Sequence, residues 1–232
     1  MSRILKGNLI LILNILLLTS PVFVRAEGTT ENPVIRYVAL GDSYTIGTGA
    51  RHGESWVDFL VKDLVNDGIA IQLVANPAKA GWTTQNLIDQ ELPVLFTSKA
   101  DFITLMIGVN DWVQGINPMV FQKRFAYILE TLQLYVAPEK ILIVNIPDFS
   151  AAPKGYLFSS GRYISEGLSE FNSIIAKEAA IRRIKVVDIF TESQKMKPHA
   201  SHFSSDGLHP SKEGYAFWEK KIYPSARDLL RP

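Results

Sequence analysis

The chain has 232 residues, of which 47% are hydrophobic and 20% are charged, and its formal net charge is +1. These values fit one globular domain with a sizeable core, and they exclude a disordered chain and a strongly basic nucleic-acid-binding protein. The chain has no cysteine, which excludes disulfides, a thiol nucleophile, a cysteine zinc site and a lipid-modified amino-terminal cysteine.

The first 26 residues have the layout of a secretory signal peptide. Arg3 and Lys6 precede a run rich in leucine and isoleucine, and small residues follow near Ala26. We expect cleavage near Ala26 and a single domain over residues 27–232. The protein is then secreted or periplasmic, with no stable insertion in a membrane after cleavage.

A retained membrane anchor is the alternative interpretation of this amino-terminal run. Its apolar stretch approaches the length that spans a bilayer, but Asn14 and Pro21 interrupt it. The segment carries three of the 24 basic residues and none of the 23 acidic ones, so its removal changes the formal net charge to −2. No nucleic-acid partner is expected from that charge.

The rest of the chain alternates between predicted strands and predicted helices. The patterns predict five strands, at 34–40, 69–76, 101–108, 140–147 and 184–190. Between the strands they predict a helix from Trp56 to Gly68, a short helix capped by Thr83 or Thr84, a helix from Pro118 to Val136 and a helix from about Ser165 to Arg183. A final helix begins near Pro210. This alternation favours a parallel sheet between two layers of helices. We therefore predict a three-layer α/β domain.

In such sheets, ligands bind beyond the carboxyl ends of the strands. Four segments are therefore of interest: 41–43, 76–81, 108–111 and the stretch before the last helix. The first of them lies in "ALGDSYTIG", where Ser43 follows the first strand. A serine hydroxyl is a nucleophile only when a base lies within hydrogen-bond reach, and a serine in this position more often caps a helix or closes a turn.

The stretch "SDGLHP" contains the best candidate for that base. His209 follows Asp206 by three residues, so the carboxylate can accept the imidazole Nδ1 proton while Nε2 faces a serine. The alternative is a plain turn at Asp206 followed by the start of a helix at Pro210.

Acyl transfer also needs hydrogen-bond donors for the developing oxyanion, each worth roughly 3 to 4 kcal/mol. Gly81 can bring its backbone N–H close to a ligand, and Asn110 in "IGVND" can donate from its side-chain amide. Each is typical of a turn when taken singly. Together they favour a catalytic site.

At these residues the chain resembles the SGNH hydrolases, also called the GDSL family of esterases and lipases. "GDSY" corresponds to the first family block, Gly81 to the second, "GVND" to the third and "DGLH" to the last, in the family's order. Tyr44 stands where the family name has leucine, at a position that carries no proton transfer.

The resemblance implies a role for each motif residue. Ser43 would attack an ester carbonyl, His209 would take and return its proton, and Asp206 would orient the imidazole. The backbone N–H groups of Ser43 and Gly81 and the side chain of Asn110 would hold the oxyanion. The resemblance also implies a flavodoxin-like sheet of five parallel strands, with no metal and no organic cofactor.

Three hypotheses about function remain open at this point. The first is a secreted serine esterase acting on a small-molecule, glycan or lipid ester, including short-chain acyl esters, lysophospholipids and acetylated glycans. The second is a metal-dependent hydrolase that uses His199 and His202 with His209 and Asp206. The third is a non-catalytic module of the same fold that binds a glycan or lipid.

Several other residues beside the motifs have open roles. Asp42 and Asp111 are expected to accept hydrogen bonds from loop amides, outside the catalytic set. Four large side chains either line an acyl or alcohol pocket or pack into the core: Tyr44, Trp82, Met106 and Trp112.

Overall fold

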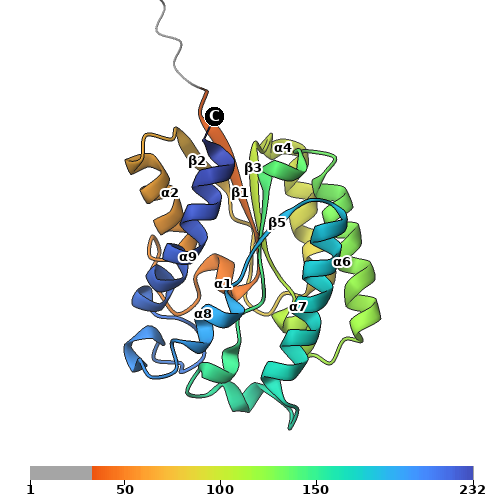
Figure 1. Ribbon diagram of the computed structural model, residues 1–232, viewed down its shortest axis with the longest axis vertical. Helices are drawn as coiled ribbons and strands as arrows, with labels where there is room; N and C mark the ends of the chain where they lie inside the picture. The colour runs from red at the N-terminus through yellow and green to blue at the C-terminus, as the bar shows by residue number, and fades with distance from the viewer. Residues whose placement is uncertain (1–32, 232) are drawn as a thin grey trace, which may run out of the picture. The chain divides into compact units, whose positions relative to one another are not determined.

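The computed structural model describes residues 33–231, and the predicted signal peptide lies outside the described residues. One sheet is formed by five strands: β1 (Ile35–Gly41), β2 (Ile71–Ala75), β3 (Phe102–Met106), β4 (Ile141–Val144) and β5 (Lys185–Val187). All neighbouring strands are parallel, in the flavodoxin-like order β2-β1-β3-β4-β5. The predicted α/β fold with five parallel strands is confirmed (Figure 1).

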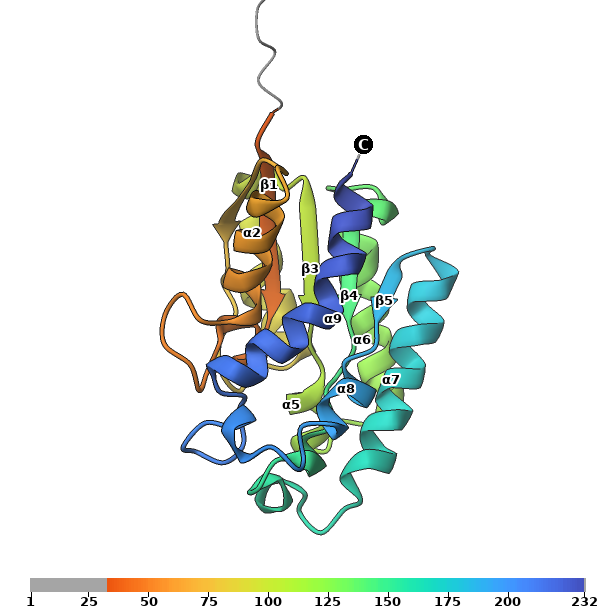
Figure 2. The same ribbon diagram turned by 60° about the vertical axis from the view of Figure 1, so that its left-hand side comes forward.

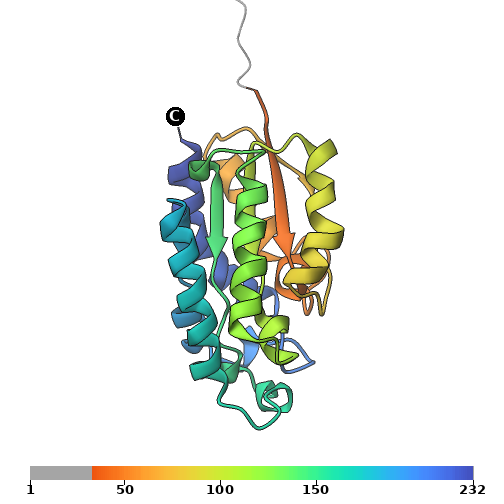
Figure 3. The same cartoon turned by 90° about the vertical axis from the view of Figure 1, so that its right-hand side faces the viewer.

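Helices cover both faces of this sheet. α2 (Trp56–Asn66) packs with α9 (Lys212–Leu230) on one face, and α6 (Pro118–Leu132) packs with α7 (Ile164–Ile181) on the other (Figures 1 and 3). The shorter α-helices of the described residues are α1 (Ser43–Ile46), α3 (Thr84–Asn86), α4 (Leu95–Ser98), α5 (Val109–Val113) and α8 (Phe190–Gln194). Within residues 33–231, no helix is long and apolar enough to span a membrane.

The apolar content of the central strands follows from this layering. All five residues of β3 and all four of β4 are buried, because each strand has neighbours on both sides and helices on both faces. The last strand is shorter than predicted. It ends at Val187 because the Asn145 side chain accepts the backbone N–H groups of Ile189 and Phe190, which turns the chain into α8.

The predicted end of one long helix is wrong by four residues. α6 begins at Pro118 as predicted, with Asn117 as its N-cap, but it ends at Leu132 instead of Val136. The Leu132 carbonyl accepts from both Tyr135 and Val136, so the chain tightens into a turn there. Pro138 disfavours helical backbone in the residue before it.

A larger difference lies between residues 84 and 98, where only one short helix was expected. α3 is capped by Thr83 as predicted, and it is followed by a π-helical turn at Leu87–Glu91, a 3-10 turn at Leu92–Val94 and α4. The π-helical turn ends at Glu91, whose side chain is completely buried. Hydrophobic periodicity does not predict such a turn, because its buried side chains do not follow the 3.6-residue spacing of an α-helix.

The segments that follow the strands gather at one end of the sheet. α1 follows β1 and α5 follows β3, while the chain after β4 forms a 3-10 turn at Gly155–Phe158 (Figure 2). The loop before α9 lies at the same end. This is the end at which ligands bind in open parallel sheets.

Close packing at the end of β1 generates a testable prediction about stability. A Cβ atom on Gly41 would lie 2.2 Å from Thr45 Oγ1 and 2.3 Å from the Met106 carbonyl oxygen. We expect Gly41→Ala to lower the free energy of unfolding by about 3 kcal/mol, as severe overpacking does, measured by urea denaturation.

Gly68→Ala is the matched control for this substitution. Gly68 has a left-handed backbone with φ of 81°, and no atom lies within 4 Å of its Cβ position. It should cost only the left-handed strain of about 1 kcal/mol. Equal losses in the two variants would contradict a packing constraint at Gly41.

Candidate active site

A pocket of about 180 Å³ lies at the carboxyl end of the sheet and collects four of the five predicted site residues. Ser43, Gly81, Asn110 and His209 all line it. The fifth, Asp206, is hydrogen-bonded to the His209 ring. The fold therefore brings together motif residues from segments that are far apart in the sequence.

Ser43 begins α1, two residues after the end of β1. Asp42 is the N-cap of α1, and its Oδ1 atom accepts the Tyr44 N–H at 3.0 Å. Ser43 is the first residue of the helix and is 5% exposed. Because the first N–H groups of a helix have no acceptor within the helix, the Ser43 amide is free to donate to a ligand in the pocket.

The loop before α9 holds a carboxylate against an imidazole ring. Asp206 Oδ2 lies 2.7 Å from His209 Nδ1, while Oδ1 accepts the backbone N–H groups of Leu208 at 2.7 Å and His209 at 2.9 Å. Partial burial by itself would raise the pKa of Asp206, but the hydrogen bonds from the Leu208 amide and the His209 ring hold that pKa well below its usual range. The carboxylate therefore stays ionised and fixes the ring, and His209 Nε2 is left to exchange a proton with a group in the pocket.

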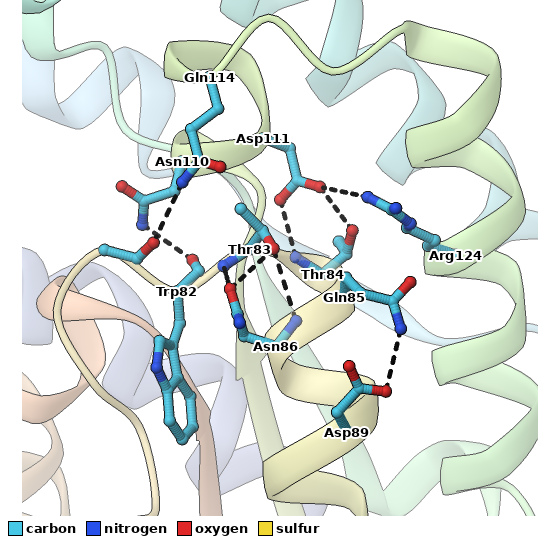
Figure 4. A network of polar contacts seen from close by, with 11 residues as sticks. Trp82, Thr83, Thr84, Gln85, Asn86, Asp89, Asn110, Asp111, Gln114 and Arg124 are labelled. Carbon is cyan, nitrogen blue, oxygen red and sulfur yellow. Dashed lines mark hydrogen bonds and ion pairs between the residues drawn. The ribbon is translucent and has the colours of Figure 1, made fainter.

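Two hydrogen bonds join the segments that carry the candidate oxyanion donors Gly81 and Asn110. Asn110 Nδ2 donates to the Trp82 carbonyl oxygen at 2.9 Å, and Gln114 Nε2 donates to the Gly81 carbonyl oxygen at 3.4 Å (Figure 4). Gly81 has a left-handed backbone with φ of 82°, a conformation that glycine adopts without strain. The Asn110 amide carries two N–H bonds, so one remains for a ligand after the contact with Trp82.

The buried Asp111, next to Asn110, joins α5 to the start of α3. Its carboxylate accepts the Thr84 N–H at 2.8 Å and the Thr84 hydroxyl at 2.5 Å, and Arg124 Nη1 lies 3.9 Å away (Figure 4). Burial raises the pKa of Asp111, while the hydrogen bonds from Thr84 oppose that rise. The expectation that Asp42 and Asp111 accept from loop amides is confirmed by these contacts.

The pocket wall is largely apolar. Of the four large side chains whose role was open, Tyr44 lines the pocket, while Met106 and Trp112 are buried in the core. Trp82 is half-buried and does not line the pocket, and Lys79 Nζ lies 5.3 Å from the centre of its ring. The pocket's remaining lining is Ala80, Val109, Val113, Phe149, Phe158 and Leu208. The two valines lie four residues apart on α5, beside Asn110, and this spacing is the one signal that could have indicated them. The two phenylalanines lie in a long loop whose path the sequence does not predict.

His199 and His202, the two further histidines of the metal hypothesis, do not line the pocket that contains Ser43. The His199 and His202 rings are 5.0 Å apart, and His202 stacks on Phe217 at 5.1 Å. Asp206 and His209 are already bonded to each other. Across the described residues, no three His, Asp or Glu side chains are placed so that they could hold a metal ion.

Two buried carboxyl groups hold the backbone on either side of Ser43. Asp42 is 1% exposed and Glu91 is fully buried, and Glu91 Oε2 accepts the Gly41 N–H at 2.8 Å. Burial raises the pKa of each group to about 8; the charge of Asp42 adds to the rise at Glu91, and the charge of Asp111 adds to the rise at Asp42. Both are therefore mostly protonated at neutral pH. The sequence analysis did not identify Glu91, because it lies 50 residues from the glycine that it contacts.

Comparison with known proteins identifies a family over most of the chain. Residues 39–217 match the sequence model of the GDSL-like lipase/acylhydrolase family. The match begins in β1 and extends into α9, so it includes every predicted site residue.

Individual relatives are similar at lower identity. Esterase TesA of Pseudomonas aeruginosa is 23% identical over 83% of this chain and 88% of that protein. A lipase/acylhydrolase structure from Enterococcus faecalis has a TM-score of 0.67 at 22% identity, covering 86% of this chain and 98% of that one. The acetyl xylan esterase AlAXEase has a TM-score of 0.66 at 17% identity, covering 82% and 99%. These structures share the fold described above.

The buried Glu91 carboxyl predicts a pH dependence of stability. Its pKa in the folded protein, about 8, is above the ordinary value of 4.5, so the folded state binds more protons than the unfolded state between these pH values. The free energy of unfolding should therefore fall as pH rises from about 4.5 to 8, by up to about 1.4 kcal/mol per pH unit for this group.

Glu91→Gln tests this dependence, because the amide can accept from Gly41 and does not ionise. Urea denaturation at several pH values between 5 and 8.5 should give a shallower decline in the variant than in the unchanged protein. Part of the decline should persist, since Asp42 still titrates in the same direction. Identical slopes for the two proteins would contradict the burial of an ionisable Glu91.

Proposed function

The chain belongs to the GDSL-like lipase/acylhydrolase family and is a carboxylic ester hydrolase, and from this premise we propose that Ser43, His209 and Asp206 form its catalytic triad. The observation that carries the proposal is the composition of one pocket. A serine, a histidine fixed by a carboxylate and two oxyanion donors all meet there. No metal or organic cofactor is needed for this chemistry.

The first half of the reaction forms an acyl-enzyme. Ser43 Oγ attacks the ester carbonyl carbon, and its proton passes to His209 Nε2. When the tetrahedral intermediate collapses, the bond to the alcohol oxygen breaks and His209 returns the proton to that oxygen. In the second half, a water molecule attacks the acyl group by the same route, and Ser43 leaves with the proton.

The other polar groups act on charges that develop during these steps. Asp206 stays ionised because its pKa is depressed, so it stabilises the imidazolium of His209 and fixes the ring whose Nε2 takes the serine proton. The oxyanion accepts hydrogen bonds from the amides of Ser43 and Gly81 and from Asn110 Nδ2. Since the Asn110 side chain is already held by Trp82, little reorganisation is required when charge appears.

The pocket lining supports an ester with an apolar acyl group. Val109, Val113, Phe149 and Phe158 offer only hydrocarbon to a bound ligand, and the acyl chain is the part of an ester that such a wall accommodates. The similar proteins include an esterase and an acetyl xylan esterase. Lysophospholipids and acetylated glycans are accordingly the two substrate classes that we propose to distinguish.

We also propose that residues 1–26 direct the protein out of the cytoplasm and are then removed. The support is the basic start, the apolar run and the small residues near Ala26. Analysis of the amino-terminal residue of the protein recovered from outside the cytoplasm tests this proposal. An intact Met1 on that protein would contradict cleavage.

The triad predicts that two substitutions are nearly equivalent in effect. Ser43→Ala and His209→Ala should each lower kcat/KM on p-nitrophenyl butyrate by at least about 10³-fold, because the two residues act as one unit. Ser173→Ala, at an exposed serine on α7, is the matched control and should keep full activity. Near-normal activity in His209→Ala would show that another group is the base.

A panel of p-nitrophenyl esters with increasing acyl length tests the substrate class. While added CH₂ groups still enter the pocket, kcat/KM should rise by up to about fourfold per CH₂, as expected for apolar burial. The assay uses the chain from Glu27, which contains the whole described domain. A marked preference for acetate over every longer ester would instead favour an acetylated glycan as the substrate.

A further inference from the structure

The segment from Lys154 to Tyr163 projects beyond the carboxyl ends of the strands, at the opposite end of the domain from the last turn of α9 (Figures 1 and 2). We call residues 154–163 the lip. Four of its large side chains are exposed to solvent: Tyr156 (67%), Leu157 (61%), Phe158 (41%) and Tyr163 (81%). Such a concentration of apolar surface on a projecting segment marks an interaction site.

The base of the lip is fixed to the domain. Gly155 is buried, and a Cβ atom there would lie 2.0 Å from the Phe149 carbonyl oxygen. Arg162 donates to the carbonyl oxygens of Trp112 at 2.7 Å and Val113 at 2.9 Å. The apolar side chains are therefore presented on an anchored base, so their exposure is part of the folded structure.

The lip also contacts the pocket of the proposed active site and the loop that carries His209. Phe158 lines the pocket that contains Ser43. The Lys154 N–H donates to the Gly207 carbonyl oxygen at 2.8 Å, and the Lys154 stem packs closely against Gly207. Gly207 belongs to the loop that carries the proposed base, so the lip connects the outer surface with the pocket wall and the catalytic loop.

We propose that the lip docks on a lipid surface and passes the acyl chain of a membrane-borne ester along Phe158 to the pocket. The second part rests on the proposed function, whereas the docking itself does not. Leu157 and Phe158 present hydrocarbon that can enter the acyl region, and the two tyrosines have the amphipathic rings that suit the headgroup level.

The charge of this region also suits a lipid surface. Lys154 and Arg162 are the only charged residues from 149 to 163, whereas the acidic Glu166 and Glu170 follow the lip on α7, beside Tyr163. A basic and apolar segment is attracted to membranes that contain anionic lipid. The exposed Leu157 and Phe158 have no polar group for the hydroxyls of a glycan, which is why we favour a lipid surface.

Co-sedimentation with vesicles tests the docking without any use of catalysis. The chain from Glu27, carrying Ser43→Ala, is mixed with vesicles of phosphatidylcholine alone or with added phosphatidylglycerol. We expect binding to both, with tighter binding to the anionic vesicles. The double variant Tyr156→Ser with Leu157→Ser should bind at least about tenfold more weakly.

A second double variant is the matched control. Phe96 and Leu134 are 76% and 82% exposed and lie before β3 and β4, at the opposite end of the strands from the lip. Phe96→Ser with Leu134→Ser should leave vesicle binding unchanged. Absence of binding by the parent protein, or an equal loss in both double variants, would overturn the docking proposal.

Activity assays then separate this proposal from the proposed function. With Ser43 intact, the lip variant should hydrolyse soluble p-nitrophenyl acetate within about twofold of the parent rate, but it should hydrolyse a vesicle-borne ester at least about fivefold more slowly. If no ester is hydrolysed while vesicles are still bound, the proposed function fails and the docking stands. Lip-dependent sedimentation with insoluble acetylated polysaccharide, and none with vesicles, would assign the lip to a glycan and overturn the lipid proposal.

Discussion

The parallel pairing of β1 with β3 is the constraint on which the proposed active site depends. The two strands are in register from Tyr37 opposite Phe102 to Gly41 opposite Met106, so both end at the same level. Ser43 follows the end of one strand and Asn110 follows the end of the other. Because a ladder of backbone hydrogen bonds fixes this register, the proposed nucleophile and oxyanion donor cannot shift past one another without breaking the centre of the sheet.

Buried carboxyl groups hold the turns that follow these strands. Asp42 binds the start of α1, Glu91 binds the amide of Gly41, and Asp111 binds Thr84. Burial raises the pKa of all three carboxyls, so each stabilises its turn at a cost in desolvation. Asp206 is the contrasting case, because its hydrogen-bonded partners lower its pKa. The environment therefore keeps one carboxylate ionised next to His209, whereas Asp42 and Glu91 remain mostly protonated at neutral pH.

The apolar pocket and the lip share one side chain, Phe158, which lines the pocket and is 41% exposed. Phe149 and Phe158 come from the loop after β4, and both line the pocket, while the neighbouring Tyr156 and Leu157 are exposed. The same loop is bonded to Gly207 in the loop of the proposed base. The proposed substrate contacts and the proposed base thus lie on neighbouring segments, so we expect changes in this loop to alter the substrate while the polar residues of the site stay in place.

The sequence by itself determined the five strands, the long helices and the polar residues of the candidate site, because hydrophobic periodicity, caps and short motifs are local properties. Ser43, Gly81, Asn110 and His209 were predicted in this way, and the structure places them in one pocket. Only the tertiary structure decided the apolar wall, the buried contact of Glu91 with Gly41 and the projection of the lip. Those features arise where distant segments meet, and burial, pKa and exposure depend on what surrounds a side chain in space.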